Sequence, residues 1–236
     1  MKLYAYCLIE DLDAFDTSTH GISGAAVRLL QIDELAVLVT DFNTDTVTVT
    51  RENALAHAAV VRSVLDRTTP LPFRFGTLVT EQQLRSYISA RKPALQTRLA
   101  HVRGCVEMSV KIIREVSEDR AEHRDEVTSG TSFLEEKRRE LLGNEQKTTA
   151  ASEIETWLHE QVGGLIRDEQ VTLRPSEKLV LAAAHLVERG KIPQYKERMA
   201  VARKNRPELH FLFSGPWPPY SFANIELEFK TQFGVS

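Results

Sequence analysis

The sequence predicts an α+β protein of two domains followed by a short tail. Its 236 residues suffice for two domains of roughly 100–150 residues each. Both halves alternate between short apolar segments typical of strands and longer segments with the 3.6-residue period of helices. The hydrophobic fraction of 42% and charged fraction of 27% are those of a soluble globular protein. We expect an N-terminal domain over 1–104, a C-terminal domain over 105–214 and a tail over 215–236, rich in proline and aromatic residues.

Strands dominate the first fifty residues. Leu3–Ile9 is an apolar run rich in aromatic and β-favouring residues, which predicts a buried strand. Two further apolar runs, Ala25–Ile32 and Leu35–Thr40, flank an Asp-Glu pair and indicate a β-hairpin. The segment Asp41–Thr50 is predicted to be a loop, although valine alternates with threonine there and leaves a short edge strand as an alternative.

The stretch from Thr69 to Thr80 is predicted to be an inner strand on which the first domain assembles. Its two prolines cannot lie inside a helix and favour extended backbone. Leu71, Phe73 and Phe75 then share one large apolar face that must be buried. Arg74 lies on the other face, where it either pairs with a carboxylate inside the molecule or serves a partner.

Helical patterns lie on both sides of this stretch, at Arg51–Arg67 and Glu81–Val102. A threonine precedes each pattern, and Thr80 with Gln83 forms a capping box. Pro93 would break a helix interior, so we expect it in the first turn of a new helix. The N-terminal domain is therefore expected to be β-β-β-α-β-α, with helices on one face of a sheet.

The second half contains one ambiguous segment, Leu179–Glu188, whose three alanines favour a helix while its length and flanks fit a buried strand. The other expected elements are strands and helices at Cys105–Ile113, Phe133–Ile166, Asp168–Arg174, Pro193–Arg203 and Leu209–Ser214, in the order strand, helix, strand, helix, strand. With a strand at the ambiguous segment the order is β-α-β-β-α-β. That order is the ferredoxin-like pattern, an antiparallel sheet backed by two helices.

No arrangement of residues indicates catalysis. The seven histidines are scattered without the spacing of a helical zinc site, and no Gly-rich phosphate loop or Gly-x-Ser-x-Gly motif is present. Cys7 and Cys105 lie in apolar contexts typical of buried, reduced thiols. His57 borders an apolar helix stripe, where a hydrogen-bonded structural role is the expectation. We therefore expect no enzyme, no catalytic, cofactor-binding or metal-binding residue, and no cofactor.

Charge and hydropathy limit the partners. The net charge is −3, and the small basic cluster of Arg198, Arg203, Lys204 and Arg206 has acidic neighbours and no interleaved aromatic residue. Nucleic acid is therefore not an expected partner. No segment has the length of apolar sequence that crosses a bilayer, and the first residues lack a signal-peptide pattern. We expect no lipid-membrane partner and a cytoplasmic location.

The tail carries the candidate interaction residues. Its segment Gly215–Tyr220 holds three prolines, a Trp and a Tyr, and is expected to be stiff and extended, as a connector or as a docking segment. Alternation over Ile225–Phe229 allows the tail to add to a sheet as a strand. Trp217 is expected to pack against folded protein and fix the path of the tail. The candidate interaction or structural residues are Arg74, Trp217, Tyr220 and Phe222.

Two motifs carry a family resemblance. The segment Leu71–Thr77, Leu-Pro-Phe-Arg-Phe-Gly-Thr, follows a helix that contains His57, and a second signature, Ser-Gly-Pro-Trp-Pro-Pro-Tyr-Ser-Phe, occupies Ser214–Phe222. With the opening Tyr-Ala-Tyr-Cys at Tyr4 and Gly-Ile-Ser-Gly at Gly21, these motifs resemble the gas vesicle proteins GvpF and GvpL. The resemblance favours a strand at the ambiguous segment.

The resemblance also implies a function. Such a protein would be an accessory or minor structural component that binds the hydrophobic main shell protein GvpA, and other accessory Gvp proteins, and supports gas vesicle assembly. It implies a location in the cytoplasm in association with the vesicle. The alternatives are a small-molecule-binding or enzymatic ferredoxin-like protein, which needs an enclosed polar pocket, and a general chaperone.

Overall fold

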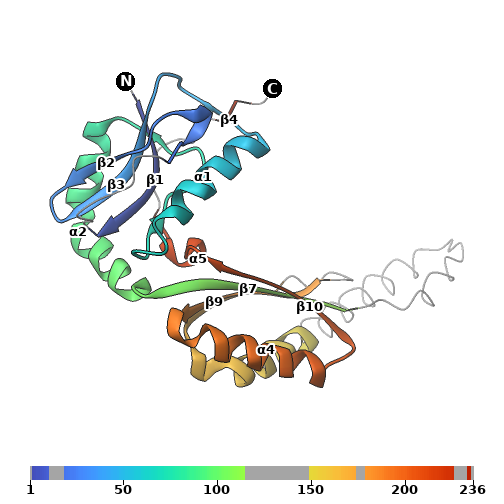
Figure 1. The fold of residues 1–236 in the computed structure, drawn as a ribbon. Helices are drawn as coiled ribbons and strands as arrows, with labels where there is room; N and C mark the ends of the chain where they lie inside the picture. The colour runs from blue at the N-terminus through green and yellow to red at the C-terminus, as the bar shows by residue number, and fades with distance from the viewer. Residues whose placement is uncertain (1, 11–18, 115–148, 174–178, 226–232, 235–236) are drawn as a thin grey trace, which may run out of the picture. The chain divides into compact units, whose positions relative to one another are not determined.

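The computed structural model describes residues 2–10, 19–114, 149–173, 179–225 and 233–234 (Figure 1). The protein is α+β with two antiparallel sheets, as its sequence predicts. It divides into two compact units, Met1–Glu107 with Pro216–Ser236 and Met108–Gly215. The tail is thus grouped with the first unit. The ferredoxin-like classification of the second half stays a prediction.

The sheet of the first unit is built around its N-terminal strand, which is buried along nearly its whole length. The strand order is β2-β3-β1-β5, and β6 also pairs with β1. The predicted hairpin is confirmed, because β2 and β3 pair antiparallel around Asp33, whose φ is 54°. The strands of this unit are β1 Lys2–Glu10, β2 Arg28–Ile32, β3 Leu35–Phe42, β5 Leu71–Pro72 and β6 Leu78–Val79.

A separate pair of short strands forms in the segment Asp41–Thr50, where the sequence left a short edge strand as an alternative to a loop. β4, Val47–Thr48, pairs in parallel with β11, Phe233–Gly234. Strand addition by the tail therefore occurs at Phe233, later than the alternating segment that suggested it. Residues 226–229 of that segment lie outside the described residues.

The stretch from Thr69 to Thr80 is not an inner strand, and that prediction is wrong. The stretch contains only β5 and β6, which pair with β1 and leave β5 at the edge of the sheet. Between them the chain turns at Gly76, whose φ is 84°, and the Thr77 N–H and hydroxyl both donate to the Arg74 carbonyl. The physical reason is Pro72, because a residue without an N–H is confined to sheet edges.

Two helices cover the first unit's sheet. α1, Arg51–Ser63, begins after Thr50, whose hydroxyl accepts the Asn53 N–H at 3.1 Å. α2, Glu81–Val102, begins at the predicted capping box. It runs unbroken through Pro93, so the expected new helix there is wrong. Apolar residues before and after the proline belong to one buried face, and their packing keeps α2 continuous through Pro93.

The second unit has the strand order β10-β7-β9-β8. The ambiguous segment is a strand, β9, and its partner β8 places Glu169 opposite His185. Residues 149–162 are helical, and the earlier part of the expected helix lies outside the described residues. The elements are β7 Cys105–Arg114, β8 Ile166–Leu173, β9 Leu179–Glu188, α4 Ile192–Asn205 and β10 Leu209–Trp217, with 3-10 turns at Gly163–Leu165 and Arg189–Lys191.

Candidate interaction site

The tail forms a surface of the first unit with Trp217 at its start. The Arg62 guanidinium, in the last turn of α1, lies 5.8 Å from the centroid of the Trp217 ring. Arginine over an indole face is attracted by the quadrupole of the ring. The contact fixes one face of Trp217, yet 39% of the residue stays exposed. An aromatic side chain is therefore both positioned and accessible.

A short helix that the sequence did not predict follows this tryptophan. α5, Tyr220–Ala223, has its first turn held by a buried carboxylate from β7. Glu107 accepts the Ser221 backbone N–H at 2.7 Å and the Ser221 hydroxyl at 2.9 Å. Burial raises the pKa of Glu107, and the two Ser221 hydrogen bonds oppose that shift. A polar group that is buried costs free energy unless it is hydrogen-bonded, so Glu107 depends on the tail.

The end of α5 is held by a cation and by apolar packing. The Arg98 guanidinium, from α2, donates to the backbone carbonyls of Asn224 and Ala223. Phe222 and Ile225 are buried, at 7% and 5% exposure. Polar contacts at both ends of α5, together with the buried side chains of Phe222 and Ile225, fix the tail segment on the first unit.

Tyr220, at the start of α5, stays 40% exposed and lies over a buried aromatic cluster. Its ring centroid is 6.4 Å from that of His57 in α1. The Tyr4 hydroxyl accepts the Gly76 N–H at 3.1 Å and is also hydrogen-bonded to His57 Nδ1 at 2.8 Å. The rings of the cluster are Tyr4, Tyr6, Phe42, His57 and Phe75.

The electrostatics of this cluster suit a structural role. Burial lowers the pKa of His57 to about 4, so the imidazole is neutral at neutral pH, and the Phe73 carbonyl only partly opposes the shift. Burial also raises the pKa of Tyr4 and of Tyr6. The expectation of a hydrogen-bonded structural histidine is confirmed. Neutral, hydrogen-bonded groups of this kind hold α1 against the sheet.

The candidate residues named from sequence fall into different places. Trp217, Tyr220 and Phe222 lie together in the tail segment, and Phe222 is the buried one. Arg74 is exposed in the turn between β5 and β6. Sequence reasoning missed Arg62, Arg98 and Glu107. An acidic residue inside an apolar strand was the one local signal for Glu107, and the two arginines have none.

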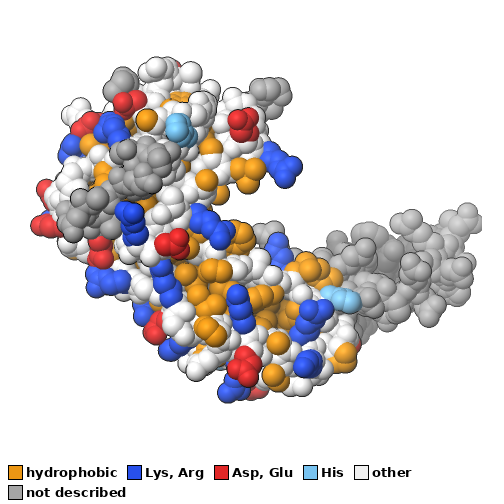
Figure 2. All heavy atoms as spheres, viewed as in Figure 1, with side chains coloured by type: hydrophobic (Ala, Val, Ile, Leu, Met, Phe, Trp, Pro, Cys, Tyr) orange, Lys and Arg blue, Asp and Glu red, His pale blue; other side chains and the backbone are white. Residues whose placement is uncertain are grey.

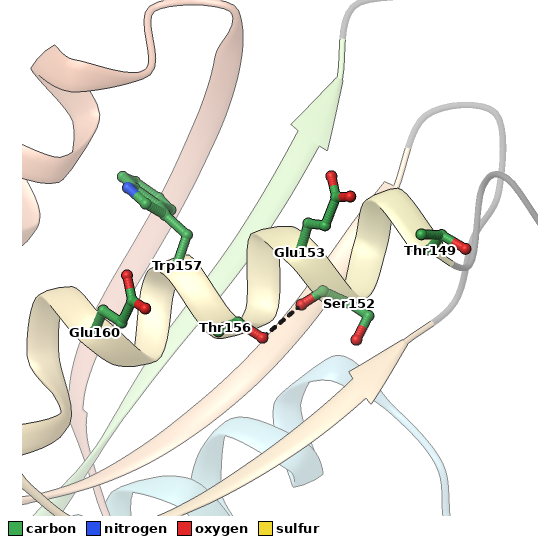
Figure 3. Close-up of a pocket in the computed structure, with 6 residues that line it drawn as sticks. All are labelled: Thr149, Ser152, Glu153, Thr156, Trp157 and Glu160. Atoms are coloured by element: carbon green, nitrogen blue, oxygen red, sulfur yellow. Dashed lines mark hydrogen bonds between the residues drawn. The ribbon is translucent and has the colours of Figure 1, made fainter.

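Two surface hollows are the candidates for the pocket that a small-molecule-binding protein needs. The hollow in Figure 3 is lined by side chains of the helix of residues 149–162, and a second by side chains of α2. In Figure 3 the lining side chains spread along one helix instead of converging on a point. The first hollow is lined by Thr149, Ser152, Glu153, Thr156, Trp157 and Glu160.

Within the described residues, no group of three or more His, Cys, Asp or Glu side chains could hold a metal ion. No helix among those residues has the length and apolar character needed to span a membrane. Cys7 and Cys105 are buried free thiols, as expected.

Comparison with known proteins gives these features a family context. The family model described as gas vesicle synthesis protein GvpL/GvpF matches residues 2–224. The chain belongs to the GvpL/GvpF family. It is 25% identical to gas vesicle protein F1 of Halobacterium salinarum over 238 residues, which cover 99% of this chain and 98% of the relative. It is 29% identical to gas vesicle protein L of a Streptomyces species over 252 residues, which cover 95% and 94%.

Solved structures of family members share the fold. The crystal structure of GvpF from Anabaena matches with a TM-score of 0.76 at 18% identity, over 95% of this chain and 99% of that one. GvpF from Microcystis aeruginosa matches with the same score and coverage at 16% identity. Membership of the GvpL/GvpF family supports an accessory role in gas vesicles and involvement with other gas vesicle proteins.

Proposed function

We propose that this protein is a gas vesicle assembly factor that binds the hydrophobic shell protein GvpA through the exposed aromatic side chains of its tail segment. The proposal places the protein in the cytoplasm, associated with the vesicle, as a binding protein without a catalytic role. Family membership supports the gas vesicle context. The aromatic surface supports the binding mode.

The observation that carries the proposal is the pair Trp217 and Tyr220. Both rings are anchored on α1 neighbours, yet they stay 39% and 40% exposed. Tryptophan and tyrosine dominate binding surfaces because they bury much apolar area with few rotatable bonds. Anchoring lowers the ordering cost further. A hydrophobic shell subunit is the kind of partner that such a surface suits.

Co-purification with affinity-tagged GvpA tests the proposal. Trp217→Ala should reduce the amount of this protein recovered with GvpA by about tenfold or more, as expected for a central aromatic contact. Trp157→Ala is the matched control, because Trp157 is the other tryptophan of the chain and also lies under an arginine, Arg206, at 5.1 Å. The control should bind as wild type does.

Two results would contradict the proposal. One is equal recovery of wild type and Trp217→Ala with GvpA, which would move the contact elsewhere on the molecule. The other is formation of normal vesicles after deletion of the gene, together with no detectable contact with GvpA. The second result would remove the assembly role itself.

A further inference from the structure

The second unit carries an unusual edge strand. β10 lies at one end of the sheet order β10-β7-β9-β8, and β8 lies at the other. β8 has the charged residues Arg167, Asp168 and Glu169, and charge is a common protection of a sheet edge. β10 reads Leu-His-Phe-Leu-Phe-Ser-Gly-Pro-Trp and has no Asp, Glu, Lys or Arg. Pro216, near the end of β10, is the only residue of the strand without a backbone N–H. The part of β10 before Pro216 can therefore form backbone hydrogen bonds with an added strand.

Hydrophobic side chains of β10 are exposed on this edge. Leu212 is 55% exposed and Phe213 is 37% exposed. Phe213 stacks on Tyr195 of α4, with ring centroids 5.8 Å apart, so it lies on the helix-covered face of the sheet. Leu212 therefore points to the opposite face, because successive side chains of a strand alternate. The edge thus presents Leu212 on the face away from α4, while Phe213 is stacked against α4 on the other face.

The helix beside this edge is cationic. α4 has four basic residues and one acidic residue between Ile192 and Asn205, a net charge of +3 from 4 − 1. Tyr195, Met199 and Ala202 are its buried face. At 100° per residue, Arg198 lies on one flank of that face, and Lys196 and Arg203 lie on the other flank. Whichever flank extends past β10, it brings positive charge to the edge.

Figure 2 agrees with this arrangement. In the region where Figure 1 labels α4 and β10, hydrophobic side chains form a patch with Lys and Arg side chains among them. Val201, 47% exposed, adds to the exposed apolar residues on α4. An apolar strand edge next to cations is complementary to a strand in which apolar and acidic residues alternate.

We propose that β10 is a docking edge for an extended segment of a partner protein in which apolar and acidic residues alternate. The segment adds as a strand beside Leu209–Ser214. Its apolar side chains lie next to Leu212 on the open face, and its carboxylates reach the cations of α4 on the other face. This site lies on the part of β10 that belongs to the second unit, and the proposal does not rest on the GvpA contact proposed at Trp217.

Fluorescence anisotropy with a labelled synthetic peptide tests the proposal. The peptide alternates Val and Glu, and its control has Lys at every Glu position. The full-length protein should bind the Glu peptide saturably, more weakly at high salt because charge attraction is screened. The Lys peptide should bind at least about tenfold more weakly, since like charges on α4 and the peptide repel. Equal binding of the two peptides would overturn the proposal.

Variants locate the site. Leu212→Glu should weaken binding of the Glu peptide by about tenfold, the effect of losing a central contact. Leu55→Glu makes the same change at a leucine of α1 that is 60% exposed, and it should leave binding unchanged. The double variant Arg198→Glu with Arg203→Glu should weaken binding and flatten its salt dependence.

The contrary outcomes are equally specific. Equal affinity of Leu212→Glu and Leu55→Glu would place the peptide elsewhere and overturn the proposal. Light scattering that shows a wild-type dimer, absent in Leu212→Glu, would identify a second copy of the chain as the occupant and would overturn the assignment to an acidic partner. Because Leu212 is largely exposed, the variant is expected to keep the wild-type melting temperature, which circular dichroism checks.

Discussion

Removing one oxygen atom, in Tyr4→Phe, should destabilise the first unit without changing its shape. The Tyr4 hydroxyl lies in the core, accepts the Gly76 N–H at 3.1 Å and shares a hydrogen bond of 2.8 Å with His57 Nδ1. Phenylalanine keeps the ring and its packing. It leaves two buried polar atoms without the partner that each now has.

The magnitude follows from those two atoms. A buried donor or acceptor that loses its partner costs about 1–3 kcal/mol. Two such atoms give a loss of roughly 2–6 kcal/mol in the free energy of unfolding. Tyr6→Phe provides the comparison. The Tyr6 hydroxyl accepts the Ile22 N–H at 2.8 Å and bonds Thr40, but the Thr40 hydroxyl also bonds the Ala26 carbonyl at 3.2 Å. Its loss should therefore cost less than that of Tyr4.

Urea titration followed by tryptophan fluorescence measures this difference. In a Trp157→Phe background the remaining indole is Trp217, which belongs to the first unit, so its emission reports unfolding of that unit. A Tyr4→Phe protein within about 0.5 kcal/mol of its parent, the usual range of surface substitutions, would refute the reasoning. It would mean that water or a rearranged neighbour satisfies His57 and Gly76.

Three further predictions concern the core, the tail and pH. Phe73→Ala should lower the free energy of unfolding by about 3–5 kcal/mol, because Phe73 is 1% exposed, and an unchanged melting point of soluble protein would contradict its core position. Trp217→Ala should speed proteolysis after residue 214 while the first unit stays folded, and equal cleavage of wild type would show that the ring does not hold the tail. Burial lowers the pKa of His57 from 6.5 to about 4, so its contribution to the free energy of unfolding is fully present above pH 6.5 and is lost as pH falls from 6.5 through 4. The loss is on the order of 3 kcal/mol in total. Unfolding measured across that window should show a shallower pH slope in His57→Gln, and an equal slope would exclude His57 as the source.

Local sequence signals predicted most of the elements. The capping box at Thr80 and Gln83 marks the start of α2, and the N-cap at Thr50 marks the start of α1. The alternation of apolar residues that begins at Cys105 predicted the strand that the structure has there, β7. These signals work because caps and side-chain periodicity depend on residues within a few positions of one another. The motifs at Leu71 and Ser214 likewise sufficed to indicate the family.

The candidate site depended on contacts that no local signal encodes. Ser221 and Glu107 are 114 positions apart, and only folding shows that one binds the other. The placement of Trp217 on Arg62 has the same origin. Sequence named the tryptophan because of its unusual composition, but it could not name the arginine, which resembles any exposed cation at a helix end.

The sequence by itself determined the α+β class, the hairpin, the helix starts and the family. Tertiary structure alone decided that Pro93 lies within one continuous helix, that the stretch after Thr69 lies at a sheet edge, and that α5 forms after Trp217. The physical reason is that propensity and periodicity act locally and are worth fractions of a kcal/mol to about 1 kcal/mol per residue. Burial of apolar side chains and pairing of buried polar groups act between distant segments and are worth about 1–3 kcal/mol each, so they prevail where the two conflict.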